Sequence, residues 1–348
     1  GNILDVMTAD SILKKIDTLF DHKEAAPNLS LAVHYLLEHR FTEADAALQK
    51  AKAIGLKKYE SYAAAFDVNL ELGRYMDANS NLYTIRAEND YGYKFRQSKW
   101  QHYKGNMDSS ISAMKKAIAL SGNDISLQQA ALSNTADLYL HNGELQKANE
   151  LYMQSVKLST ADLHSIMGLG WIALVHDKNI VLAKKIFSFV QTKTASPDPL
   201  LKLIQTAEAI SDSNAAKQLA NEFIIKVSDS LYGNMYNKYL VDLYTSVMNQ
   251  PAKAVAIASK ELTNRATPQT YAWYVYALYK NGQGDEAFKI YQEQISGKPL
   301  EGLELYWIGK MMQGLKKGYN AKAYFEEAYK NRYDLSPAKI HDLENIQQ

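Results

Sequence analysis

Apolar residues recur every three or four positions along most of the chain. The clearest case lies between residues 301 and 335, where a polar turn separates two such runs: Leu305, Ile308, Gly309 and Met312, then Ala321, Phe325 and Ala328. Side chains three and four residues apart share one face of an α-helix. The pattern therefore predicts two short antiparallel helices that bury their apolar faces against each other and against neighbours.

This two-helix pattern occurs nine times. A small residue marks the same place on each second helix, at positions 44, 78, 110, 148, 183, 220, 254, 287 and 321. The spacing averages about 35 residues, close to the ~34-residue period of one class of helical repeat. Unrelated amphipathic helices would not keep this period with a small residue at each contact.

The order of these residues resembles the tetratricopeptide (TPR) motif, over roughly residues 25 to 335. Repeat two adds Leu72-Gly73-Arg74-Tyr75, with the glycine in the turn between helices, where a left-handed backbone costs it nothing. The resemblance implies an all-α fold, a right-handed α-solenoid of about nine TPR-like helix pairs with capping helices. It says almost nothing about function, since one fold hosts many.

Four segments follow from this interpretation. They are an N-terminal capping helix in residues 1–24, TPR-like repeats one to five in 25–197, repeats six to nine in 198–335, and a C-terminal capping helix in 336–348. We expect the first helix over residues 9–21, capped by Asp10 or Ser11, with an inward apolar stripe of Ile12, Leu13, Ile16, Leu19 and Phe20. In the last helix, Ile340, Leu343 and Ile346 are expected inside, and Lys339, Asp342 and Glu344 in solvent.

Two repeats depart from the motif. The residue that we align with Gly309 is Phe66 in repeat two and Trp171 in repeat five, so these helix pairs are expected to splay or shift. Residues 261 to 330 also resemble the closing repeats of exported bacterial TPR proteins. The start at Gly1 suggests that a leader has been removed. Together with this resemblance it favours a periplasmic or extracellular protein. The removed leader is expected to be a signal peptide or a segment that carries a lipid anchor. The alternative is a cytoplasmic protein.

Composition excludes several classes of function. The 39 basic and 38 acidic residues give a net charge of +1, so no overall field attracts nucleic acid or an anionic membrane. There is no cysteine, hence no disulfide and no thiol catalysis. No apolar run reaches the ~18 residues of a membrane span.

The inner surface of the solenoid is the predicted binding site. Transferring the inward offsets of repeat nine to repeats seven and eight predicts a tyrosine-lined groove with nearby lysines: Tyr236, Tyr239, Tyr276, Tyr279, Tyr306, Lys280 and Lys310. Tyrosine offers a rigid face and a hydroxyl, which suits extended peptides or sugar rings. The alternative is that these rings only fill space between helices.

A second set of inward residues carries charge. Asp67, Lys99 and Asp137 hold equivalent places in repeats two to four and predict either a charge ladder that binds a partner or a solvated set of salt bridges.

His102, His141 and His176 end the first helices of repeats three to five. Because three repeats rarely bring ligands to one ion, we expect helix-end contacts and no metal site.

The sequence contains none of the catalytic and cofactor-binding motifs HExxH, GxxxxGK[ST], GxSxG and the Rossmann glycine pattern. We therefore predict a protein that is not an enzyme, needs no cofactor and binds a protein or peptide partner in its concave groove. The alternative is a periplasmic or surface carbohydrate-binding protein that uses the same tyrosines. Lysines beside the rings, in place of acids and amides, favour the peptide.

Overall fold

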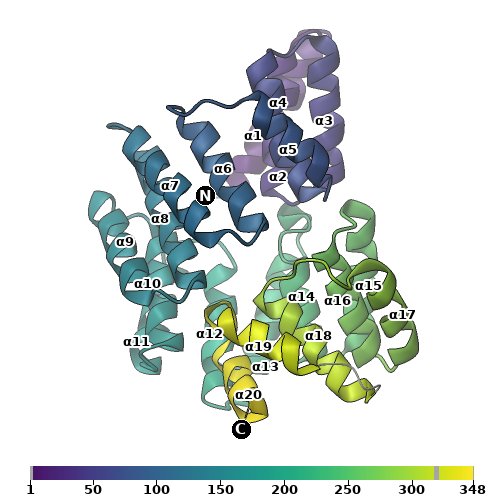
Figure 1. Cartoon of the computed structure of the whole chain (residues 1–348). Helices are drawn as coiled ribbons and strands as arrows, with labels where there is room; N and C mark the ends of the chain where they lie inside the picture. Colours follow the sequence, from purple (N-terminus) through teal and green to yellow (C-terminus); the bar gives the residue numbers. More distant parts are fainter. Residues whose placement is uncertain (1–2, 317–320, 348) are drawn as a thin grey trace.

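The computed structural model describes residues 3–316 and 321–347, and within these residues it contains helices and no strand. Most helices form nine antiparallel pairs in chain order (Figure 1). The pairs are α2 (Ala25–Leu37) with α3 (Phe41–Ile54), α4 (Lys58–Glu71) with α5 (Tyr75–Thr84), α6 (Tyr91–Tyr103) with α7 (Met107–Leu120), α8 (Ile125–His141) with α9 (Leu145–Leu158), α10 (Leu163–Val175) with α11 (Ile180–Gln191), α12 (Asp198–Ala209) with α13 (Ser213–Val227), α14 (Asn237–Thr245) with α15 (Pro251–Asn264), α16 (Pro268–Lys280) with α17 (Gly284–Gln294), and α18 (Gly302–Leu315) with α19 (Ala321–Lys330).

The predicted small positions lie where the two helices of each pair touch. Ala44, Ala78, Ser110, Ala148, Ala183, Ala220, Ala254 and Ala287 all have an exposed fraction of 0%, and Ala321 is half-buried. A larger side chain at these points would push the helices apart, because helix axes in contact are only ~8–10 Å apart. The predicted all-α solenoid of TPR-like pairs is therefore confirmed.

Glycines permit the closest helix contacts. A Cβ on Gly309 would lie 2.6 Å from the Phe325 ring, and one on Gly170 would lie 2.7 Å from the Phe187 ring. Gly170, rather than Trp171, thus occupies the contact position in repeat five, so our alignment of Trp171 with Gly309 was wrong by one residue. Phe66 in repeat two is fully buried in the same cluster as Ala78.

The turns between paired helices use left-handed backbone as predicted. Gly73, between α4 and α5, has a φ of +73°, and its N–H donates to the carbonyl of Leu70. A residue with a Cβ is strained in this conformation. The α14–α15 turn ends at Pro251, which begins α15 at the predicted first-turn position.

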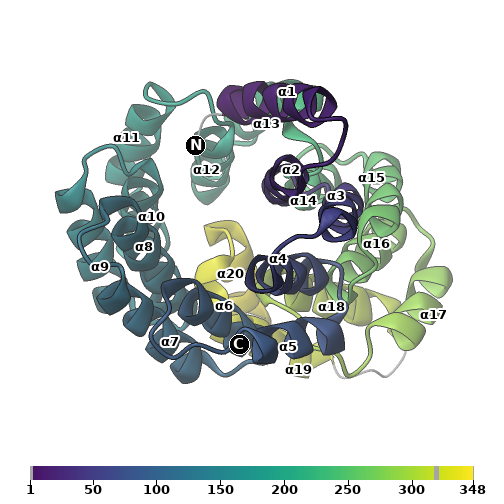
Figure 2. The same cartoon turned by 90° about the horizontal axis from the view of Figure 1, so that it is seen from above.

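The solenoid makes one turn and closes on itself. Figure 2 shows the helices arranged as a ring, and Figure 1 shows the first repeats lying above repeats seven and eight. The contact is specific: Asn264 Oδ1 accepts a hydrogen bond from the Phe41 N–H at 2.9 Å, and Asn264 Nδ2 donates to the His39 carbonyl at 2.7 Å. Arg265 forms an ion pair with Glu71 at 3.1 Å.

The C-terminal segment enters the ring. After α19 come the 3₁₀ turn η2 (Arg332–Asp334) and α20 (Pro337–Gln347), which packs against α12 and α19 (Figure 2). Leu343 is fully buried, as expected. Lys339 was expected in solvent, but it is 8% exposed and pairs with Asp242 of α14 at 2.9 Å. Burial of the ammonium is offset by that carboxylate.

The first helix, α1 (Ile3–Leu19), packs against α2 and the 3₁₀ turn η1 (Ser230–Tyr232). Its expected apolar stripe is largely wrong, since Ile12, Leu19 and Phe20 are more than half exposed. Asp10 lies inside the helix rather than at its start. There it is buried and bonded to His34 Nδ1 of α2 at 2.6 Å, a polar contact that the apolar pattern could not reveal.

Candidate functional site

A cavity lies inside the ring. Two adjoining parts, of about 790 and 500 Å³, share Lys99, His102, His141, Lys238 and Glu301 in their walls, and we call them together the central cavity. The first helices of repeats two to nine all contribute to its lining, as does η2. The array thus presents one helix of nearly every repeat to the same space.

The predicted tyrosines do not form one open groove. Tyr236 is buried and donates to Asp198 at 3.0 Å, and Tyr276 is buried with its ring stacked on Trp307 at 5.2 Å. Tyr239 is 36% exposed and lines the central cavity. Of these three rings, only Tyr239 presents a face to a ligand.

Helix α20 contacts two further residues of the predicted groove, Tyr306 and Lys310. Tyr306 donates to Asp342 at 2.8 Å and Lys310 pairs with the same carboxylate at 3.0 Å. Both residues do point inward, yet the chain's own last helix occupies that part of the groove. Tyr279 is half-buried and Lys280 is exposed, and neither lines the central cavity.

The predicted charge ladder forms only in part, because Asp67 and Lys99 contact each other whereas Asp137 is bonded to other residues. Asp67 is paired with Arg96 at 2.7 Å and lies 3.9 Å from Lys99. Asp137 accepts a hydrogen bond from the Tyr152 hydroxyl at 2.5 Å and contacts His164 Nε2 at 2.9 Å. Lys99 and Asp137 line the central cavity, whereas Asp67 does not.

Two of the three singled-out histidines meet in the cavity wall. The His102 and His141 rings lie 5.1 Å apart, whereas His176 lies against Tyr333 elsewhere. His141 Nδ1 contacts Asp334 of η2 at 2.5 Å. Burial alone would lower the pKa of His141, but the hydrogen bond and charge of Asp334 outweigh it and raise the pKa. In the described part of the chain, no group of three metal-type side chains converges.

A buried ion pair crosses from α14 to α18. Lys238 Nζ lies 2.8 Å from Glu304, which is 0% exposed and also accepts a hydrogen bond from the Trp273 indole at 2.7 Å. Burial would lower the pKa of Lys238, but the carboxylates of Glu304 and Glu301 raise it. The pair fixes one wall of the cavity. No pattern along the sequence predicts this pair, because nothing local relates residues 66 positions apart.

Lys202 of α12 lines the cavity without an ion-pair partner among the described residues. Its Nζ lies 3.5 Å from the centre of the Trp171 ring, and among the described residues no carboxylate lies within 4.0 Å of it. Burial lowers the pKa of Lys202 to about 8, against the weaker opposing effects of Asp198, Asp334 and Asp137. These three acids are hydrogen-bonded to other side chains. No pattern along the chain points to this lysine.

None of the described helices is long and apolar enough to cross a membrane. The arrangement defines the class of protein: an α-solenoid of tetratricopeptide-type repeats with an internal cavity. Neither a family model nor a curated protein matches the sequence.

Solved structures of similar shape are found at low sequence identity. A TPR protein from Parabacteroides merdae is 16% identical, with a TM-score of 0.42, over 79% of this chain and 99% of that one. The Pseudomonas aeruginosa pilF structure is 14% identical, with a TM-score of 0.43, over 62% and 97%. Human IFIT1, in a dimer with PPP-AAAA, is 13% identical, with a TM-score of 0.48, over 87% and 72%. At such values these similarities say nothing about what this chain binds.

Proposed function

We propose that the protein is a non-enzymatic interaction scaffold that binds an extended segment of a partner polypeptide in the central cavity. The observation that carries the proposal is the lining itself, to which the first helices of repeats two to nine all contribute. Repeat spacing sets these side chains at regular intervals, so an extended chain can contact several repeats in turn. The curvature of a solenoid creates the kind of extended concave surface that repeat proteins use for binding.

The chemistry of the wall suits a polypeptide. Acidic and basic side chains alternate in it with aromatic rings, among them Lys202, Tyr239 and Glu301. A peptide backbone needs both donors and acceptors, and its side chains carry both charges. Because ion pairs and packing hold most of these groups in place, the cost of ordering falls mainly on the ligand.

Other ligand classes find less support. Stacking on sugar rings needs open aromatic faces, but the Lys202 ammonium covers one face of Trp171, and Tyr276 lies against Trp307. Nucleic acid needs a surplus of positive charge, whereas the described cavity lining carries both signs in similar measure. Carbohydrate therefore remains the second proposal.

A selection from a display library of random peptides tests the proposal even though the natural partner is unidentified. We expect retained peptides whose affinity falls about tenfold or more when Lys202→Met or Tyr239→Ala alters the cavity wall, a loss typical of an interface residue in direct contact. Lys280→Met and Tyr279→Ala are matched controls outside the cavity and should leave affinity unchanged. A library that yields no binder, or binders indifferent to the cavity variants, would refute the proposal.

A further inference from the structure

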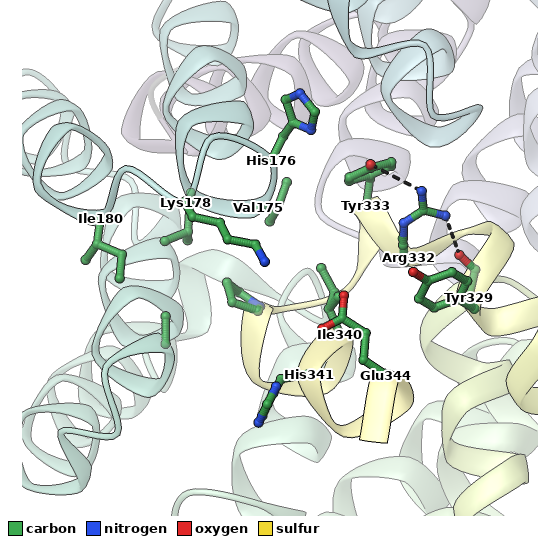
Figure 3. Close-up of a pocket in the computed structure, with 13 residues that line it drawn as sticks. Val175, His176, Lys178, Ile180, Tyr329, Arg332, Tyr333, Ile340, His341 and Glu344 are labelled. Carbon is green, nitrogen blue, oxygen red and sulfur yellow. Dashed lines mark hydrogen bonds between the residues drawn. The ribbon is translucent and has the colours of Figure 1, made fainter. Parts of the chain in front are cut away.

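A second cavity lies outside the central one, between the middle of the solenoid and its C-terminal segment. It measures about 410 Å³, and we call it the tail pocket. The end of α10 and the turn that follows it form one wall, and α19, η2 and α20 form the other (Figure 3). A volume of this size is in the range of small-molecule sites in proteins, which run from ~300 to 1,000 Å³.

Part of the lining of the tail pocket is apolar. Leu174 and Val175 at the end of α10 are nearly fully buried, and Ile180 of α11 and Ile340 of α20 add aliphatic surface. Such a floor holds a small hydrocarbon side chain by removing both surfaces from water.

Two cations stand around this floor. Lys178, in the turn after α10, has no carboxylate within 4.0 Å among the described residues. Arg332 of η2 is held in place, since its guanidinium lies 4.6 Å from each of the Tyr329 and Tyr333 ring centres. It donates to the Tyr329 carbonyl at 3.1 Å and to the Tyr333 hydroxyl at 3.3 Å. A guanidinium has five N–H donors, so others remain for a ligand.

An acid faces the same space from α20. Figure 3 shows the Glu344 carboxylate and the Lys178 ammonium pointing into the pocket from opposite walls. Glu344 is half-buried and forms no ion pair within 4.0 Å with any described residue. Lys178 is exposed and Glu344 is half-buried, and neither has an ion-pair partner among the described residues, so a ligand that carries both charges would supply a partner to each.

We propose that the tail pocket binds a free α-amino acid with an aliphatic side chain. The ligand's carboxylate is bound by Lys178 and Arg332, its ammonium by Glu344, and its side chain by the floor of Val175, Ile180 and Ile340. A simple anion would leave Glu344 without a partner, and a purely apolar molecule would desolvate all three charges. A zwitterion with a hydrocarbon side chain meets each requirement. Tyr333 belongs to the walls of both cavities, but Lys178, Arg332 and Glu344 line the tail pocket and not the central cavity. The inference does not depend on the peptide proposal.

Calorimetric titration of the full chain with four probes tests the inference: L-leucine, N-acetyl-leucine, leucinamide and glycine. We expect saturable binding of leucine, and binding weaker by about tenfold or more for each of the other three, because each lacks the ammonium, the carboxylate or the hydrocarbon side chain.

Two variants assign the charges. Glu344→Gln should weaken leucine about tenfold but leave N-acetyl-leucine unchanged, since that probe has no ammonium to lose. Lys178→Met should weaken leucine but leave leucinamide unchanged. Lys184→Met and Glu293→Gln, on exposed helix surfaces outside the pocket, are the matched controls. All four positions are at least partly exposed, and a thermal unfolding scan verifies folding. Absence of saturable leucine binding, or equal leucine affinity in Glu344→Gln, Lys178→Met and wild type, would overturn the proposal.

Discussion

The side chain of Asn264 hydrogen-bonds to the backbone of Phe41 across 223 residues of sequence, with 2.9 Å between Oδ1 and N. Asn264 is 7% exposed, and its Nδ2 also donates to the His39 carbonyl at 2.7 Å. The side-chain amide of Asn264, at the end of repeat seven, therefore pairs with one backbone N–H and one backbone carbonyl of repeat one. This contact joins the two halves of the solenoid.

Asn264→Ala is expected to destabilise the fold. The change leaves the buried Phe41 N–H without its partner, which costs about 1–3 kcal/mol in the free energy of unfolding. Urea unfolding followed by circular dichroism measures it. Asn281→Ala, in an exposed turn where the side chain donates to Gln283, is the control and should change stability by less than ~0.5 kcal/mol. Equal effects of the two variants would show that the contact does not stabilise the ring.

Gly170→Ala should also destabilise, although alanine is the better helix former. The added Cβ would lie 2.7 Å from the Phe187 ring and 2.9 Å from the Ile186 side chain, and both of these residues belong to α11. Overpacking of this kind costs about 1–3 kcal/mol. In Gly92→Ala, also in a helix, the added carbon would meet chiefly the flexible end of Arg96 at 3.2 Å, so we expect no loss of stability. Thermal unfolding of the two variants compares them directly, and a Gly170→Ala protein as stable as wild type would refute the close contact.

The ion pair between His141 and Asp334 should make the docking of η2 depend on pH. The pKa of His141 is raised in the folded state, so the pair stabilises fully below the ordinary histidine pKa and is lost as pH rises through the raised value. Wild type should therefore exceed His141→Gln in stability by about 1 kcal/mol at pH 6, with the difference shrinking toward pH 8.5. Unfolding titrations at several pH values measure this. A difference that grows with pH would contradict the assignment, and Asp334→Asn should remove the same pH dependence.

The charge of Lys202 should lower the stability of the fold, whereas that of His141 raises it. The folded pKa of Lys202, about 8, lies below the ordinary lysine value, so the charged side chain opposes folding below pH 8, and this cost falls as pH rises from about 8 toward 10.5. Lys202→Met is thus expected to raise the melting temperature at pH 7, with a smaller gain at pH 10. Lys280→Met, at an exposed position, should leave the melting temperature unchanged at both pH values. A Lys202→Met protein less stable than wild type at pH 7 would contradict the burial cost.

The repeat period was visible in the sequence because each helix pair must bury a small residue at the same contact, and eight such positions are fully buried. The contact residue in repeat five was misassigned because Gly170 and Trp171 are adjacent and both fit an apolar helix face. The first helix was misjudged for another reason. Its contacts with α2 include Asp10 with His34 and Asp17 with Asn28, which apolar periodicity does not detect.

The binding surface was less predictable than the fold. Of the residues at the inward offsets, Tyr239, Lys99 and Asp137 line the central cavity. The offsets could not show that Asp342 of α20 would engage Tyr306, because that depends on where the last helix docks. Lys202 and the Lys238–Glu304 pair depend likewise on distances between repeats, which no local pattern records.

The contact between repeats one and seven gives the cavity a continuous wall. An open solenoid can receive a strand from the side, whereas here Asn264 joins repeat seven to repeat one and bars that side. A polypeptide with a free end can thread past this contact, whereas a loop held between two folded domains would enter on this side only after Asn264 releases repeat one. Association rates for linear and cyclised versions of one peptide would thus report directly on whether the ring opens.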